Sequence, residues 1–330
     1  MLIHNTEIGK LPHIKNVPRD GRAVPLMQFF DDKASEWHLY VMHDEEHLVR
    51  LLDGEPIIGD YLSHSPANGL TDLEFGLGTM IVQHLSFEEV LSTLSKLEDD
   101  LRNCGAVLRT YNLIWTTRGN QLDLAATQLV QAQFEYVVLL LRSYYDLLQM
   151  LVRDVWSRLK SRDPAAPHPR KLPNSFRKMV LGEGGLIASA EIGAIWGIPA
   201  PLADWYATEA PFFRKLRDIR DGIAHHGHQP PSVFTIDGWG FAIDTSREPW
   251  VGKVHVRENS LGSFRAVFGG FIMHALQAAT RLAMTIEQII ELPPALNEDL
   301  FVFVRSPVGA ELTRLEGVLT QPWEGRDSDL

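Results

Sequence analysis

Arginines and histidines gather between positions 217 and 228, in the run RDIRDGIAHHGH. A guanidinium group binds phosphate through paired N–H donors, and an imidazole can transfer protons near neutral pH. The two residue types together are suited to chemistry on a phosphate ester. Arg220, Asp221 and His225 are therefore the candidate catalytic residues.

Helical spacing predicts how these side chains are arranged. Arg217, Asp221 and His225 lie four residues apart on one solvent-side stripe, so Asp221 can orient His225. Arg220 lies about 140° from His225 around an ideal helix, so the two meet only if the helix unwinds at Gly222 or a second subunit contributes. The residues expected to bind substrate are Arg214, Lys215, Arg217, His226 and His228.

The choice between the two adjacent histidines depends on the end of the helix. Gly227 is placed to cap it, and the helix dipole there stabilises a protonated imidazole. If the last turn stays helical, His226 points toward the core side and His225 toward solvent, which favours His225 as the functional histidine.

Four long helices are predicted to position this run. Apolar residues recur at helical spacing over 86–117, 121–160, 201–224 and 261–290. Ser86 followed by Glu89 predicts a capping box at the start of the first helix, and Pro293 and Pro294 end the last one. The candidate residues fall at the end of the third helix.

The remaining segments suggest a mainly α fold with small β additions. Two short apolar runs, 232–236 and 241–245, flank a glycine-containing turn and predict a β-hairpin between the third and fourth helices. We expect an antiparallel four-helix bundle over 85–292, a small mixed α/β or irregular region of unknown fold over 1–84, and a C-terminal tail over 293–330.

The run around the third helix end resembles the signature of the HEPN superfamily, an arginine, usually followed by a polar residue, and a histidine four to six residues downstream. Arg220, Asp221 and His225 match the form with four intervening residues, and Arg220 with His226 matches the form with five. The resemblance covers about 86–291. It implies a HEPN-like helical bundle and a homodimer whose motif residues meet across a two-fold axis.

For active members, the resemblance also implies cleavage of RNA without a metal, by attack of the ribose 2′-hydroxyl on the adjacent phosphate. Arg220 would bind the phosphate, His225 would transfer protons and Asp221 would orient them. Two alternatives remain open: a noncatalytic helical module that dimerises or docks a partner protein through the N-terminal region, and a phosphate or nucleotide binder.

Charge limits where a nucleic acid could bind. The chain has a net charge of −11, which argues against nonspecific coating of nucleic acid. Residues 153–220, however, contain 12 Lys or Arg and 7 acidic residues. A basic groove for a phosphodiester backbone could be lined there by Arg170, Lys171, Arg177, Lys178, Arg214, Lys215 and Arg217.

Composition also bears on redox state, metals and membranes. Cys104 is the only cysteine, so neither an intramolecular disulfide nor a cysteine-built zinc site can form. Adjacent histidines on a helix point about 100° apart, which disfavours a metal site at 225–228. We expect no metal, no cofactor and no membrane span, and a cytoplasmic location.

Overall fold

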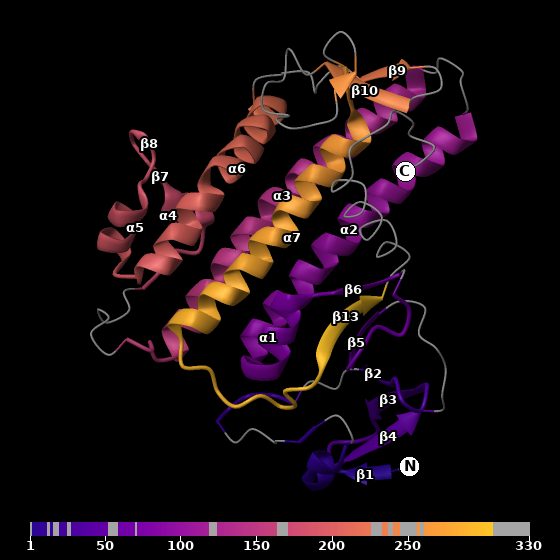
Figure 1. The fold of residues 1–330 in the computed structure, drawn as a ribbon, viewed down its shortest axis with the longest axis vertical. Coiled ribbons are helices and arrows are strands. Elements are labelled where there is room, and N and C mark those ends of the chain that lie inside the picture. The colour runs from indigo at the N-terminus through magenta and orange to yellow at the C-terminus, as the bar shows by residue number, and fades with distance from the viewer. Residues whose placement is uncertain are drawn as a thin grey trace.

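Long helices form one part of the molecule, and a mixed β-sheet lies at one end of them (Figure 1). This arrangement comes from a computed structural model. The described residues are 2–11, 14–15, 20–24, 28–51, 59–69, 71–118, 124–163, 171–225, 233–236, 240–244, 256–257 and 261–305.

The four long helices are α2 (Glu88–Arg118), α3 (Leu124–Arg158), α6 (Ala200–His225) and α7 (Phe264–Ile289). The helix α3 packs against each of the other three, and α2 and α6 also contact α7. Large side chains fully buried between them include Phe134, Tyr144, Tyr145, Tyr206, Phe213 and Phe268. Burial of this aromatic surface is the main favourable contribution to the packing of the helices.

Short elements complete the helical part. They are α1 (Gly76–His84), α4 (Phe176–Val180), the two-residue strands β7 (Leu181–Gly182) and β8 (Gly185–Leu186), and α5 (Ser189–Trp196). The Phe176 ring lies against Tyr145, Tyr206 and Phe213, so α4 is anchored to both α3 and α6. The β7–β8 hairpin leaves the bundle at that anchor.

The larger sheet has seven strands in the order β1-β4-β3-β2-β5-β13-β6. Its strands are β1 (Leu2–His4), β2 (Gln28–Asp31), β3 (Glu36–Met42), β4 (His47–Leu51), β5 (Gly59–Ser63), β6 (Asp72–Glu74) and β13 (Phe301–Arg305), and a 3-10 helix (Asn5–Lys10) follows β1. Among the described strands of this sheet, β2 and β5 form the one parallel pair. The strand β13 lies between β5 and β6, so the segment taken from the sequence as a tail supplies an interior strand as far as residue 305.

A second sheet covers the end of the bundle where α6 finishes (Figure 1). Its strands, in the order β11-β12-β10-β9, are β9 (Val233–Ile236), β10 (Gly240–Asp244), β11 (Val256–Arg257) and β12 (Leu261–Ser263). The antiparallel pair β9–β10 lies where the sequence predicts a hairpin, with Gly240 opposite Ile236.

The predicted fold class is wrong, because the protein is mixed α/β and not a mainly α four-helix bundle. The strands of residues 1–84 are short, and apolar and polar residues do not alternate regularly along them. Their partner strand β13 is about 230 residues away in the sequence. The capping box is also absent. The Ser86 hydroxyl is buried without a hydrogen-bond partner, and the backbone N–H of Ala23 donates to the Ser86 carbonyl.

Among the described residues, α3 is the helix that is long and apolar enough to cross a membrane by length and composition. The core helix of a soluble protein meets the same criterion, and the side of α3 that faces the other helices is buried.

Candidate functional site

The C-terminal half of α6 separates an apolar face from a charged one. Phe213 and Leu216 are fully buried against the other helices. Arg214 and Asp218 lie on the outer side, where they form an ion pair with Arg214 Nε 3.6 Å from Asp218 Oδ2. A helical period of 3.6 residues produces this separation, because residues three and four apart share a face.

Asp221 is held by two arginines. Arg217 Nε lies 3.2 Å from Asp221 Oδ2, and Arg220 Nη1 lies 2.9 Å from Asp221 Oδ1. The three side chains are each 27–29% exposed, so the cluster is partly shielded but reachable from solvent. One carboxylate between two guanidinium groups leaves a local charge of +1, which favours an anionic ligand.

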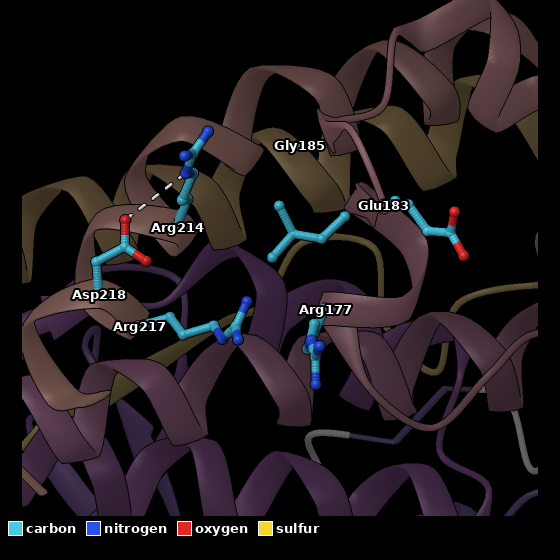
Figure 2. Close-up of a pocket in the computed structure, with 8 residues that line it drawn as sticks. Arg177, Glu183, Gly185, Arg214, Arg217 and Asp218 are labelled. Atoms are coloured by element: carbon cyan, nitrogen blue, oxygen red, sulfur yellow. Dashed lines mark ion pairs between the residues drawn. The ribbon is translucent and has the colours of Figure 1, made fainter. Parts of the chain in front are cut away.

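A pocket of about 470 Å³ adjoins this cluster (Figure 2). Its lining residues are Arg177, Leu181, Gly182, Glu183, Gly185, Arg214, Arg217 and Asp218. Figure 2 shows the side chains of Arg177 and Arg217 next to each other, with Glu183 on the hairpin side. Arg217 therefore belongs both to the pocket and to the Asp221 cluster.

The hairpin side of the pocket is positioned by contacts with α3. The backbone N–H of Phe176 donates to Asp146 Oδ1 at 3.0 Å, while Arg142 Nη1 lies 2.7 Å from Asp146 Oδ2. Asp146 thus fixes the start of α4, which leads directly into β7. Gly185 has φ +116°, a conformation that glycine adopts without strain, and this allows the chain to turn toward Arg214.

Three arginines and two carboxylates line the pocket, so its surface is of mixed charge and not uniformly basic. Guanidinium groups bind phosphate with fixed, paired donors, and the carboxylates of Glu183 and Asp218 can accept hydrogen bonds from donors on the same ligand. A phosphorylated ligand with N–H or O–H groups matches this combination of side chains.

The structure places the sequence-predicted residues as follows. Arg214 and Arg217 line the pocket with Arg177, and Arg217, Arg220 and Asp221 are brought together. Lys215 is outside the pocket lining and partly buried, and this burial lowers its pKa. His225 ends α6, but its side chain lies outside the described residues, as do His226, Gly227, His228 and Arg170.

The oxygens of Asp221 form ion pairs with Arg217 and Arg220. Its expected role in orienting His225 stays a prediction, because the side chain of His225 lies outside the described residues. Arg220 follows Arg217 by three residues, which is close enough on a helix for both to reach one carboxylate. Asp221 therefore orients Arg217 and Arg220, the two arginines expected to bind phosphate.

A second polar cluster, centred on Glu209, was missed by the sequence analysis. Its fully buried carboxylate accepts hydrogen bonds from Tyr145 Oη at 2.9 Å and from Arg281 Nε and Nη2 at 2.9 and 2.7 Å, and it lies 3.1 Å from His274 Nε2. Burial raises the pKa of Glu209, but the contacts with His274 and Arg281 outweigh it, so the pKa is lowered. The cluster ties α3, α6 and α7 together.

A signal for this cluster exists in the sequence. Glu209 follows Trp205 and precedes Phe213 at four-residue intervals, which places a carboxylate on an apolar helix face. His274 and Arg281 likewise interrupt the apolar stripe of α7. A buried charge requires an opposite partner, so these two interruptions could have been matched to Glu209.

No group of three or more His, Cys, Asp or Glu side chains within the described ranges is arranged to hold a metal ion. Cys104 is buried, and burial raises the pKa of its thiol.

Comparison of the chain with protein-family models, curated proteins and solved structures gives no match. The candidate site is therefore defined by its own residues: the Arg217–Asp221–Arg220 cluster at the end of α6 and the adjoining arginine pocket.

Proposed function

We propose that the outer face of α6 binds the phosphodiester backbone of RNA and that His225 takes part in cleaving it without a metal. The observation that carries this proposal is the shared position of Arg217, which lines the pocket and also holds Asp221 beside Arg220. The pocket can then bind one phosphate and Arg220 a neighbouring phosphate of the same RNA strand.

The roles of the residues follow from their chemistry. Arg220 binds the phosphate that is attacked, because its guanidinium group is held at the surface by Asp221. Because α6 remains helical through Gly222, Arg220 and His225 of one chain stay about 140° apart, so His225 of a second copy acts at the phosphate bound by Arg220. It accepts the proton of the attacking ribose 2′-hydroxyl, the bond from phosphorus to the 5′ oxygen breaks as a 2′,3′-cyclic phosphate forms, and water protonates the departing 5′ oxygen. Arg177, Arg214 and Arg217 bind the neighbouring nucleotide.

The charge distribution supports a local RNA site. The chain has a net charge of −11, whereas residues 153–220 contain five more basic than acidic residues, 12 against 7. RNA would therefore be attracted to this segment and repelled elsewhere. Contact with only a few phosphates gives a weaker dependence on salt than a long basic groove would.

A second candidate function is the binding of a free nucleotide or another small phosphorylated molecule. The specific observation in its favour is the pocket itself, because about 470 Å³ is within the usual range for a small-molecule site. A noncatalytic interaction module remains the third interpretation of the chain, and it requires neither phosphate binding nor His225.

The experiment that tests the proposal is cleavage of single-stranded RNA in EDTA by the full chain and its Arg220→Ala and His225→Ala variants. Circular dichroism establishes that each variant is folded. Arg109→Ala is the matched control, because Arg109 is an exposed arginine on α2, away from the pocket.

We expect both test variants to lose at least 100-fold of the wild-type rate, as loss of a positioned acid–base group or phosphate ligand costs about 10²–10⁴-fold. Arg109→Ala should cleave normally. Absence of cleavage by the wild type, combined with binding of a mononucleotide that Arg177→Ala and Arg217→Ala abolish, would establish the second candidate function instead.

A further inference from the structure

The two pocket arginines of α6 are held in the same way. Arg214 Nε lies 3.6 Å from Asp218 Oδ2, and Arg217 Nε lies 3.2 Å from Asp221 Oδ2. Each guanidinium group is thus oriented by an aspartate four residues further along the helix. Because the closest contact of each pair is made by Nε, the terminal Nη groups of both arginines are left to donate to a ligand in the pocket.

Arg177 brings a third guanidinium group to the pocket, from α4. It follows Phe176, whose fully buried ring and backbone hydrogen bond to Asp146 fix the start of α4. Among the described residues Arg177 has no hydrogen bond or ion pair, and Figure 2 shows its side chain next to that of Arg217. Adjacent cations repel each other, so the fold holds Arg177 in a position that an anion between the two arginines would stabilise.

We propose that this pocket selects a phosphate monoester, the group found at the end of an RNA strand and in a free nucleotide. The inference rests on the phosphate-binding role proposed for α6, and it adds which kind of phosphate the pocket takes. A monoester carries about 1.5 to 2 negative charges at neutral pH and has three unesterified oxygens. A phosphodiester within a strand carries one charge and has two such oxygens.

The number of oxygens distinguishes the two kinds of phosphate. A guanidinium group donates two parallel hydrogen bonds to two oxygens of one phosphate. A diester thus offers its two oxygens to one guanidinium group, whereas the third oxygen of a monoester lets both Arg177 and Arg217 donate to it. The second charge of the monoester also balances the second guanidinium group, so the pair of arginines favours a monoester.

The carboxylates beside the arginines indicate that a strand ends in the pocket. Glu183 lies on the hairpin side and Asp218 on the α6 side, so a strand that continued past them would bring its next phosphate toward a carboxylate. Arg220, in contrast, is a further guanidinium group about 4.5 Å along α6 from Arg217. A strand whose terminal phosphate occupies the pocket can therefore leave it toward Arg220.

The pocket has room for one terminal nucleotide. Its volume of about 470 Å³ is within the range of small-molecule sites, and its lining includes the apolar side chain of Leu181. Glu183 has no hydrogen bond to another described residue, so it can accept one from a ribose hydroxyl. A nucleotide with a free phosphate thus meets cationic, apolar and acceptor groups in the same pocket.

Isothermal titration calorimetry of the full chain tests the selectivity. Each of the four nucleoside 5′-monophosphates is compared with its methyl ester, in which the same phosphate has one charge fewer. Three noncleavable 2′-O-methyl tetranucleotides are also compared, with a 5′-phosphate, a 3′-phosphate or no terminal phosphate. We expect a monoester to bind at least tenfold more tightly than its matched ligand, because the second charge interacts with two guanidinium groups. No such preference in either series would overturn the proposal.

The two series also identify the source of the monoester. A preference for the 5′- or the 3′-phosphate assigns the pocket to that end of an RNA strand, whereas a preference confined to the mononucleotides assigns it to a free nucleotide. Neither measurement depends on RNA cleavage. A chain that prefers monoesters but cleaves no RNA would therefore reject the proposed ribonuclease and leave this inference standing.

Arg177→Ala tests whether the selectivity arises in the pocket. The side chain of Arg177 is exposed, so the variant should fold, which circular dichroism verifies. We expect its affinities for a monoester and the methyl ester to lie within about threefold of each other, since the guanidinium group beside Arg217 is missing. Arg109→Ala removes an equal charge from an exposed position of α2 and should keep the full preference. A preference that survives Arg177→Ala, or that both variants lose equally, contradicts the proposal.

Discussion

At the scale of single residues, Asp221 controls the charge of the candidate site. Its two oxygens pair with Arg217 and Arg220, so it orients both guanidinium groups and also neutralises part of their charge. These two effects oppose each other in ligand binding. Replacing Asp221 with asparagine removes the negative charge but keeps the shape of the side chain, so it separates the orienting effect from the neutralising effect.

Asp221→Asn should increase the affinity for a non-cleavable RNA oligonucleotide about two- to tenfold, because the two arginines lose their competing anion. Cleavage at saturating RNA should fall, since Arg220 is then less firmly oriented. Fluorescence anisotropy across a salt series measures the affinity. Glu287→Gln on α7 changes the net charge equally at an exposed position and should have little effect. Weaker RNA binding by Asp221→Asn would show that orientation outweighs charge.

At the scale of elements, a carboxyl pair lies between α2 and the large sheet. Glu98 of α2 is buried beside Asp60 of β5, and Arg102 Nη2 lies 2.6 Å from Asp60 Oδ2. Burial and the Asp60 carboxylate raise the pKa of Glu98 to about 9. Glu98 is therefore protonated at neutral pH, and its proton stabilises the junction of the two elements.

The pKa of Glu98 predicts how stability depends on pH. The folded state retains the proton above the ordinary pKa of 4.5, so the free energy of unfolding decreases as the pH rises from that value toward 9. Glu98→Gln resembles the protonated side chain and should be more stable than the wild type at pH 8.5, by on the order of 1–3 kcal/mol, with a smaller difference at pH 5.

Urea unfolding at the two pH values measures this effect. Glu88→Gln, at an exposed position of the same helix, should follow the wild type at both. A parallel pH dependence of wild type and Glu98→Gln would show that Glu98 is ionised in the folded state.

The β7–β8 hairpin gives a second prediction at this scale. Gly185 has φ +116°, so Gly185→Ala would impose about 1–3 kcal/mol of backbone strain, and its new Cβ would lie 3.7 Å from Arg214 Nη1. We expect the hairpin to shift and the affinity for phosphate-containing ligands to fall several-fold. Gly184→Ala meets nothing within 4 Å and should bind as the wild type does in isothermal titration calorimetry. Equal affinities of the two variants would exclude the hairpin from the binding site.

At the scale of the whole molecule, a buried ion pair helps to join the N-terminal strands to residues 301–305, which are far away in the sequence. Arg305 of β13 donates from Nε and Nη2 to the Asp72 carboxylate at 3.0 and 2.9 Å, and the guanidinium carbon lies 4.8 Å from the Trp37 ring centre. Tyr61 Oη donates to the same carboxylate at 2.7 Å. The N-terminal strands and residues 301–305 therefore fold as one unit.

Arg305→Met should destabilise the protein by about 3–5 kcal/mol, because it leaves the Asp72 carboxylate buried without its cation. The double variant Arg305→Met/Asp72→Asn should recover part of this loss. Arg50→Met removes a partly exposed cation that lies 3.9 Å from Glu36, a carboxylate more than half exposed, so it should cost under about 1 kcal/mol. Thermal unfolding measures all three, and equal losses for Arg305→Met and Arg50→Met would contradict the structure.

The sequence by itself determined the long helices and the charged face of α6. The four predicted ranges lie within a few residues of α2, α3, α6 and α7, because helical periodicity is a local property of apolar residues spaced three and four apart. The same spacing placed Arg217 and Asp221 on one side of the third helix, where they pair. The histidine assignment at 225–228 stays a prediction.

Only the tertiary structure decided the fold class, the pocket and the partner of Asp221. The strand β13 pairs with β5 across about 240 residues, and Arg177 reaches the pocket from a different helix than Arg214. Glu209 likewise finds Tyr145 and Arg281 on two other helices. Such contacts depend on packing between elements that are far apart in sequence, so they leave no periodic pattern in either partner alone.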